Sequence, residues 1–325
     1  MNNWRPGVSF QLLQKRARML KDIRNFFAER DIMEVETPLL SRFATTDPHL
    51  DSLQTLFRDQ RFYLNTSPEY CMKRLLADNA VPIYQISKAF RDNESGPHHN
   101  PEFTMLEWYR PGFDLQQLMD EVTGLINMLM AEKHHGVRFQ TISYQQVFED
   151  YAGFNPHAVT VTECLQCANQ HAIDIPVGLG AADDDLDDWL DWLLTQLVLP
   201  RLPRQEFSFI YDYPASQAAL ARIETSSNGY PVARRFELLY GELELANAFY
   251  ELTDAAEQRL RFNQENSQRT SMGKPTIEMD TRLLAALEQG VVDCAGVAIG
   301  LDRLLMVLSE CHSIDQVLAF SWQQA

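Results

Sequence analysis

The chain has 325 residues, of which 28 are Lys or Arg and 45 are Asp or Glu, so its formal net charge at pH 7 is −17. This acidic balance argues against a general nucleic-acid-binding protein, because phosphate neutralisation needs a basic face. The N-terminus lacks the apolar core of a signal peptide, and no stretch approaches the ~20 apolar residues that span a bilayer. Five scattered cysteines favour reduced thiols. We therefore expect a globular protein with a cytoplasmic location.

The first part of the chain alternates between helical and strand-like patterns. Ser9 can cap a helix that runs to about Arg30, with apolar residues at helical spacing along one face. Thr37-Pro38 ends that region, because the residue before proline avoids the helical conformation. The segment 61–110 contains strand-like runs and one short helix, and residues 114–133 are amphipathic and predict another helix.

The middle of the chain, about residues 140–205, has a different composition and reads as an insertion in one domain. Its acidic cluster alternates with tryptophan and leucine, which favours a helix with a solvated acidic face over a metal site, because adjacent acids on a helix point apart. Cys164 and Cys167 form a lone CxxC, for which two buried or idle thiols are favoured over a metal or redox site. The last third returns to strands and ends in a strand and a helix at 291–310. The acidic cluster comprises Asp183, Asp184, Asp185, Asp187, Asp188 and Asp191.

The first group of candidate functional residues is Thr66-Ser67-Pro68-Glu69-Tyr70. Ser67 suits the N-cap of a helix, Pro68 suits its first position, and Glu69 complements the helix dipole in the first turn. A well-formed helix start explains these residues by itself. The functional alternative is that Glu69 projects from a rigid helix end and binds a ligand ammonium group.

The second group lies in two strands joined by a polar loop, within residues 90–110. Glu107 lies on a half-apolar face and needs a partner, either a cationic ligand or a neighbouring arginine. Arg91, at the end of the first strand, offers a planar fork for a phosphate or forms a surface ion pair. Alternation divides the second strand into one face with Phe103, Met105, Glu107 and Tyr109 and another with Thr104, Leu106 and Trp108.

The third group is the acidic run 236–251. If the chain reverses at Tyr240-Gly241, Glu237 and Glu244 face each other, and carboxylates opposed at about 4.5–5.5 Å between Cβ atoms repel. A divalent cation between them removes the repulsion, and oxygen ligands suit Mg²⁺ when phosphates complete its shell. The alternative is an exposed hairpin whose acids splay into water. Periodicity does not place Glu251.

The fourth group is Gly296-Val-Ala-Ile-Gly300-Leu-Asp-Arg303, at a strand-to-helix junction. Small residues allow a ligand to approach the backbone closely, although glycines that serve only packing are the alternative. Arg303 lies in the first helical turn, where a cation opposes the helix dipole by about 0.3–1 kcal/mol. Binding a nucleotide phosphate or stacking on a base would justify this position.

Taken together and in this order, these elements resemble the catalytic domain of class II aminoacyl-tRNA synthetases over nearly the whole chain. Glu34-Val-Glu36-Thr-Pro38 is similar to motif 1, the segment from Phe90-Arg91 to Glu107 to motif 2, and Gly300-Leu-Asp-Arg303 to motif 3. Within the class, residues 99–107 and 244–254 resemble the lysyl enzymes. The resemblance implies an α+β fold with an antiparallel six-stranded sheet flanked by helices.

The chain resembles one branch more closely, the elongation factor P–(R)-β-lysine ligases, which are truncated paralogues of lysyl-tRNA synthetase. Motif 1 begins within the first forty residues, so we expect a single catalytic domain over residues 1–325 with no N-terminal anticodon-binding OB-fold. The segment Thr46-Asp-Pro-His-Leu50 stands where lysyl-tRNA synthetases usually have a glycine-rich loop. Ala298 stands where they usually have Gly, and one methyl group reshapes a closely packed pocket.

The resemblance implies how ATP binds. Arg91 grips the α-phosphate and stabilises charge as pyrophosphate leaves, and Arg303 is the second catalytic arginine. The adenine ring lies between Phe103 and Arg303 and forms a hydrogen bond with Asn100. Glu237 and Glu244 hold Mg²⁺. The further residues expected to bind ATP are Asp92, Asn93, His99, Glu244, Leu245 and Gly300.

The resemblance also implies how the amino acid binds. Glu69 takes its backbone-type ammonium group, and Glu107, Tyr109 and Glu251 take the far ammonium group, so the two sites lie at opposite ends of the pocket. Such a pocket suits a diamino acid. The further residues expected to bind the substrate are Ser67, Pro68, Asn247 and Ala298.

Two positions depart from the family pattern. Asn93 stands two residues after the motif 2 arginine, where an acid is usual, with Glu94 next, and Pro97 stands where a basic residue is usual. These departures leave details of the nucleotide and acceptor contacts open.

The reaction implied by the resemblance has two steps. ATP and (R)-β-lysine give an enzyme-bound adenylate and pyrophosphate, and the acyl group then passes to the ε-amine of a lysine on elongation factor P. Positioning and electrostatic stabilisation suffice, and no protein nucleophile is needed. The resemblance also implies a homodimer that uses no tRNA and no membrane. The alternatives are a stand-alone lysyl-tRNA synthetase or another amino-acid ligase, and a non-catalytic module that binds an amino acid or adenylate.

Overall fold

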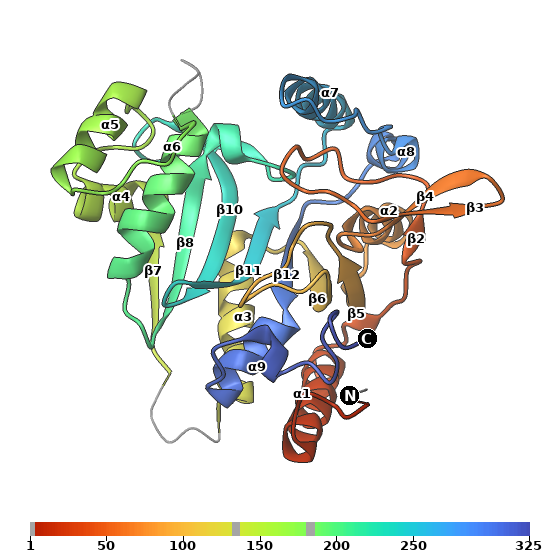
Figure 1. The fold of residues 1–325 in the computed structure, drawn as a ribbon. Helices are drawn as coiled ribbons and strands as arrows, with labels where there is room; N and C mark the ends of the chain where they lie inside the picture. The colour runs from red at the N-terminus through yellow and green to blue at the C-terminus, as the bar shows by residue number, and fades with distance from the viewer. Residues whose placement is uncertain (1–3, 132–136, 180–185) are drawn as a thin grey trace. The chain divides into compact units, whose positions relative to one another are not determined.

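The protein is described from a computed structural model over residues 4–131, 137–179 and 186–325. The chain divides into two compact units, one of residues 1–134 with 251–325 and one of residues 135–250. The predicted insertion at about 140–205 falls inside the second unit. Each unit contains its own cluster of buried apolar side chains. Figure 1 shows the elements of both units.

The first unit combines a mixed sheet, a small three-stranded sheet and helices. In the mixed sheet the order is β1-β5-β6-β12, with β1 parallel to β5 and the other pairs antiparallel, and the small antiparallel sheet has the order β2-β4-β3. Its elements are α1 (Phe10–Ala28), β1 (Met33–Glu34), β2 (Leu40–Ser41), β3 (Gln54–Phe57), β4 (Gln60–Leu64), α2 (Glu69–Asn79), β5 (Ile83–Phe90), β6 (Glu102–Pro111), α3 (Leu115–Leu129), α7 (Ala255–Ser271), α8 (Thr281–Gln289), β12 (Cys294–Gly300), α9 (Leu301–Ser309) and a 3₁₀ turn (Ile314–Gln316).

The second unit packs helices against a sheet of order β11-β10-β8-β7, with β9 beside β10 and with β7 parallel to β8. Helices α4, α5 and α6 lie beside β7 and β8 (Figure 1) and share one apolar cluster with β8 and β10. Its elements are β7 (Phe139–Ser143), α4 (Tyr144–Ala152), α5 (Val161–Gln170), α6 (Leu186–Leu193), a π-helical turn (Leu194–Val198), a 3₁₀ turn (Leu199–Arg201), β8 (Phe207–Pro214), a 3₁₀ turn (Ala215–Gln217), β9 (Ile223–Thr225), β10 (Pro231–Tyr240) and β11 (Leu243–Tyr250).

The helices and sheets confirm the α+β class. The expected antiparallel six-stranded sheet is wrong, because the number of strands is larger and some neighbouring strands are parallel. The described residues place nine strands in this framework, four in the first unit and five in the second. Two of the pairings, β1 with β5 and β7 with β8, are parallel. Both parallel strands are short strands that precede a long connection, which is the arrangement that parallel pairing requires.

Local signals in the sequence place the first helices well. Ser9 accepts a hydrogen bond from the Leu12 N–H, so α1 begins where the cap predicts. The apolar face of α1 includes Phe27, whose ring stacks on Tyr84 of β5 at 4.3 Å. Asp114 forms a capping box with Gln117 and starts α3, whose predicted end at residue 133 lies outside the described residues.

The acidic segment of the second unit folds as predicted where it is described. Residues Asp187 and Asp191 lie on the polar side of α6, and each accepts a hydrogen bond from the turn at 215–217. Asp183, Asp184 and Asp185 lie outside the described residues. Cys164 and Cys167 are buried, free thiols on α5, and burial raises the pKa of both, which confirms them as core residues.

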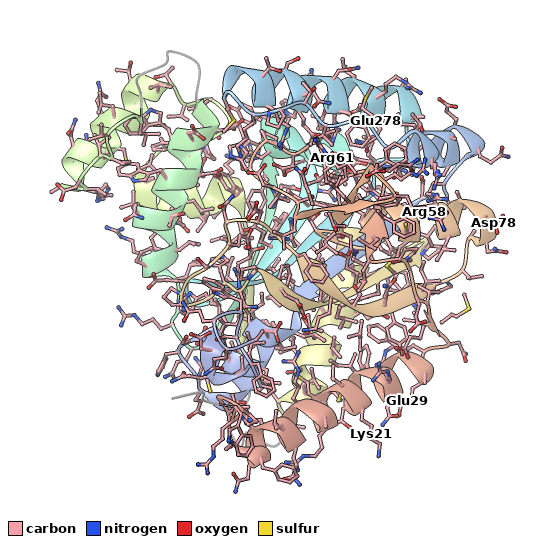
Figure 2. The ribbon with its side chains drawn as sticks, turned by 45° about the vertical axis from the view of Figure 1, so that its right-hand side comes forward. Lys21, Glu29, Arg58, Arg61, Asp78 and Glu278 are labelled. Carbon is pink, nitrogen blue, oxygen red and sulfur yellow. The ribbon has the colours of Figure 1, made fainter. Side chains whose placement is uncertain are left out.

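Charged side chains project from the surface of the first unit. Lys21 and Glu29 lie along α1, and Arg58 and Arg61 lie on the β3–β4 hairpin (Figure 2). In the described parts of the chain no helix is both long and apolar enough to cross a membrane.

Candidate active site

The predicted site residues fall into two groups that belong to different units. The first unit carries those of α2, the β5–β6 pair, residue 251 and the β12–α9 junction, and the second unit carries those of the β10–β11 hairpin. Each group has its own geometry.

Glu107 of β6 is the centre of the first group. Its side chain is 2% exposed, and it accepts hydrogen bonds from the hydroxyls of Ser67 at 2.5 Å and Tyr109 at 3.2 Å. The Ser67 oxygen also accepts the Glu69 N–H at 3.0 Å, but the N-cap of α2 is Pro68, so the predicted N-cap at Ser67 is wrong by one residue. Burial, and then the nearby Glu69 carboxylate, raise the pKa of Glu107 to about 8. A cationic ligand would favour its ionised form, which suits an ammonium site.

Glu69 and Glu251 are joined by an internal cation, Lys73. The Lys73 Nζ lies 2.7 Å from Glu69 Oε1 and 2.5 Å from Glu251 Oε2. Burial alone would lower the pKa of Lys73, but the two carboxylates outweigh burial and raise it above its ordinary value. Both carboxylates therefore contact the same lysine nitrogen, and their predicted binding of the two substrate ammonium groups stays a prediction.

The neighbouring strands add residues to the same face of the sheet. Gln85 of β5 and Ala298 of β12 are both in register with Glu107, so the methyl group of Ala298 lies beside this carboxyl group. Gln85 is 3% exposed, and its Oε1 has no hydrogen-bond partner among the described residues. A buried acceptor without a partner is costly, so Gln85 is suited to accept a hydrogen bond from a ligand N–H.

Gly296 of β12 leaves space that the pocket side chains use. It pairs with Tyr109 in the sheet. A Cβ atom at Gly296 would lie 2.4 Å from Tyr109 Cε1 and 2.5 Å from Glu251 Oε1. The close approach that this glycine allows is therefore between the backbone and the pocket's own side chains, in line with the packing alternative.

Arg91 follows β5 and is held mainly through its backbone, whose N–H donates to the Pro101 carbonyl at 3.0 Å. Its guanidinium lies 5.2 Å from the centre of the Phe103 ring and 3.4 Å from Glu94 Oε1. Such a half-exposed ion pair contributes little to stability. The Arg91 Nε is buried and has no hydrogen-bond partner within the described residues, so the guanidinium keeps donor capacity for a phosphate.

The turn after Arg91 is fixed by the segment near residue 50. Asp92 donates its N–H to the Asp51 carbonyl at 2.8 Å, and Asn93 has a φ of 62°. Asparagine tolerates this left-handed conformation better than most residues, which gives a structural reason for Asn93 at this position.

Arg303, His99 and Asn100 meet at the loop between β5 and β6. The Arg303 Nη2 lies 2.7 Å from His99 Nε2, and burial, followed by this arginine, lowers the pKa of His99. The Asn100 side chain accepts the Trp322 N–H at 3.1 Å and donates to the Glu102 carbonyl at 2.5 Å. These two bonds fix the orientation of the Asn100 amide, and each of its polar atoms has the capacity for one more hydrogen bond, so the adenine contact of Asn100 stays a prediction.

Asp302 anchors the helix that carries Arg303. It is 1% exposed and accepts the Thr104 N–H and an Arg16 N–H, both at 2.6 Å. These bonds fix the start of α9, and with it Gly300, against β6 and α1.

In the second unit, the predicted register of the β10–β11 hairpin is wrong. Glu237 pairs with Asn247, and Glu244 pairs with Leu239. The chain reverses at Gly241-Glu242, one residue later than predicted, and a bulge between Leu238 and Leu239 shifts the register again. Leu245 is buried, and its predicted ATP contact stays a prediction.

Glu237 and Glu244 nevertheless remain close enough to interact. Burial raises the pKa of Glu237 to about 7, Arg235 opposes this shift, and the Glu244 carboxylate adds to it. Arg235 donates to Glu237 Oε1 at 2.5 Å and to Asn247 Oδ1 at 3.1 Å. The chemistry of this donor set fits a Mg²⁺ ion that arrives with phosphate ligands. Among the described residues no group of three or more His, Cys, Asp or Glu side chains could hold a metal by itself.

The sequence reasoning missed three residues that the structure brings into these groups: Lys73, Gln85 and Arg235. The pairing of Lys73 could have been predicted from the sequence. Lys73 stands four residues after Glu69 on a helix, and this spacing is typical of a side-chain ion pair. Arg235 stands two residues before Glu237 on one strand face. Gln85 becomes visible only when the register with Glu107 is known.

Comparison with known proteins identifies the class. Residues 3–324 match the family model described as tRNA synthetases class II (D, K and N). The chain therefore belongs to the class II tRNA synthetases.

Curated relatives narrow this further. The chain is 43% identical to the elongation factor P–(R)-β-lysine ligase of Haemophilus influenzae strain PittGG, covering 100% of the chain and 99% of the relative. It is 44% identical to that of Pasteurella multocida strain Pm70 over 99% of the chain and 98% of the relative, and 43% identical to that of Hamiltonella defensa over the same shares. Within its class, the chain is a member of the elongation factor P–(R)-β-lysine ligase family.

Proposed function

We propose that this protein is an ATP-dependent ligase that activates (R)-β-lysine as an adenylate and transfers it to the ε-amine of a lysine on elongation factor P. The observation that carries the proposal beyond the family is an acid cluster, formed by the buried Glu107 and Glu251 and the partly buried Glu69. A pocket with this many carboxylates favours a substrate with more than one ammonium group.

In the first step a carboxylate oxygen of β-lysine attacks the α-phosphorus of ATP, the bond to the bridging oxygen breaks, and pyrophosphate leaves. Arg91 stabilises the charge that develops on the phosphates, and its Nε, which has no hydrogen-bond partner among the described residues, is one donor for this role. Arg303 and Phe103 hold the adenine ring. Glu237 and Glu244 would hold Mg²⁺, which would neutralise phosphate charge.

In the second step the neutral ε-amine of the acceptor lysine attacks the carbonyl carbon of the adenylate. An amide bond forms, AMP leaves with the electrons of the broken bond, and the amine loses a proton to solvent. Holding the two reactants together supplies much of the rate enhancement. We further propose a single catalytic domain, a homodimer, a cytoplasmic location and no tRNA substrate.

The test combines intact-mass measurement with ATP–pyrophosphate exchange. Incubation with elongation factor P, ATP and (R)-β-lysine should add one β-lysyl group to the acceptor, and Arg91→Ala should lower exchange by about 10²–10³-fold. Arg61→Ala, on the exposed β3–β4 hairpin (Figure 2), should behave as wild type. An unmodified acceptor together with charged tRNA would overturn the proposal.

A further inference from the structure

Lys73 has no role in the reaction as proposed, yet it lies inside the acid cluster. Its side chain is 2% exposed, and its ammonium group contacts carboxylates from two parts of the first unit, Glu69 on α2 and Glu251 before α7. Burying a lysine is unfavourable unless it is paired, so this position needs an explanation.

The arrangement has a simple electrostatic consequence. Two carboxylates that approach the same point in a largely buried cluster repel each other, and without a cation a proton shared between them is favoured. An ammonium group between them allows both to stay ionised. It also fixes their relative position, because both carboxylates contact the same nitrogen atom, Lys73 Nζ.

We propose that Lys73 is a positioning and specificity-determining residue: as the internal counter-ion of Glu69 and Glu251, it keeps both carboxylates ionised and in place, and so makes the pocket selective for an amino acid with two ammonium groups. This inference rests on the proposed function. The titratable groups that face the cluster are Glu69 from α2, Glu107 and Tyr109 from β6, and Glu251.

The test compares two substrates that differ in a single amine. (R)-β-lysine carries two ammonium groups, and (R)-3-aminohexanoic acid has the same chain without the terminal amine. Pyrophosphate exchange gives kcat/KM for each with wild type and Lys73→Met, whose side chain has a similar length and no charge. Thermal melting verifies that the variant is folded.

In the variant the repulsion between Glu69 and Glu251 is no longer compensated and favours a proton shared between them, so the preference for β-lysine should fall by about tenfold relative to wild type. It should recover as the pH rises and this proton leaves. Glu107 titrates in both proteins, so its effect cancels when the preference of the variant is divided by the preference of wild type at each pH. The pH dependence that is left then belongs to the proton shared by Glu69 and Glu251. An unchanged preference with an unchanged pH profile in the folded variant would overturn the inference.

A second variant covers the case in which Lys73→Met does not fold. Glu69→Gln combined with Lys73→Met removes the cation together with one carboxylate, so no repelling pair stays buried. This double variant should have a lower preference for β-lysine than wild type, and the ratio of the two preferences should not change with pH. A wild-type preference in this double variant contradicts the role of Lys73. If wild type itself shows no exchange with β-lysine, the proposed function fails instead.

Discussion

Glu107 is a residue whose charge depends on what the pocket contains. Its pKa of about 8 lies above that of an ordinary glutamate, so the folded protein without ligand holds a proton there at neutral pH. The stabilising contribution of this protonated group is present at low pH and is lost as the pH rises through about 8. An ammonium ligand, in contrast, binds the ionised form.

We therefore expect the KM for β-lysine to fall as the pH rises from about 7 to about 9, because the carboxylate becomes available. Glu107→Gln should abolish this step in the pH profile of pyrophosphate exchange. Glu288→Gln, at an exposed position, serves as the control and should keep the wild-type profile. If Glu107→Gln keeps the change in KM between about pH 7 and about pH 9, another titratable group is responsible for it.

Gly296 has no Cβ atom, and the side chains of the site occupy the space that a Cβ atom would need. Gly296→Ala would place a methyl group 2.4 Å from Tyr109 and 2.5 Å from Glu251, closer than packing allows. We expect this variant to raise the KM for β-lysine by about tenfold or more and to lower stability by about 1–3 kcal/mol. Urea denaturation and exchange kinetics measure the two effects.

The matched control is Gly124→Ala in the interior of α3, where the added methyl group would meet only Phe26, at 3.8 Å. Alanine favours a helix over glycine by about 1 kcal/mol, so this variant should be as stable as wild type or more stable. Equal KM values for both alanine variants would mean that the contacts at Gly296 do not shape the pocket.

At the scale of elements, the buried carboxylate of Asp302 connects α9 to both β6 and α1. Asp302→Ala would leave the Thr104 N–H and the Nη1 of Arg16 without this acceptor. We expect a loss of about 3 kcal/mol in the free energy of unfolding, measured in urea. Glu288→Ala removes an exposed ion pair with Arg259 and should cost less than about 1 kcal/mol. Equal losses would contradict the anchoring role of Asp302.

The elements also show which sequence signals are sufficient to predict the face and the pairing of a strand. Alternation placed Glu107 and Tyr109 on one face and Trp108 on the other, because a strand has a strict period of two. The predicted register of the β10–β11 hairpin is wrong for two reasons, neither of which periodicity encodes. The turn at Gly241-Glu242 shifts each partner by two residues, and the bulge between Leu238 and Leu239 shifts it by one more. The parallel strands β1 and β7 were missed because their partners are distant in sequence.

In the site, too, features that depend on neighbouring residues could be predicted, and contacts between residues far apart in the sequence could not. Ser67 and Glu69 were found from the rules of helix capping, which are local. The joint contact of Glu69 and Glu251 with Lys73 spans more than half of the chain, and no spacing rule predicts it. Family resemblance named most site residues, but it did not supply the partners they have in this structure.

At the scale of the whole molecule, the net charge of −17 makes the protein repel itself. Salt screens such repulsion over about 10 Å at 0.1 M ionic strength. We expect the melting temperature to rise as NaCl increases from low to physiological concentration, measured by scanning fluorimetry. Sorbitol at equal osmolality is the control and should give a smaller rise. A fall in melting temperature with NaCl would show that local ion pairs outweigh net repulsion.

The contact of Trp322 with Asn100 has a practical consequence for protein engineering. The backbone N–H of Trp322 holds the side chain of a residue expected to border adenine, and Gly7 is tied to the same segment by a hydrogen bond to Ala319. An affinity tag or fluorophore fused after Ala325 would therefore report on, and disturb, nucleotide binding. Residues 58–59, at the exposed tip of the β3–β4 hairpin, offer a site for labels that avoids these contacts.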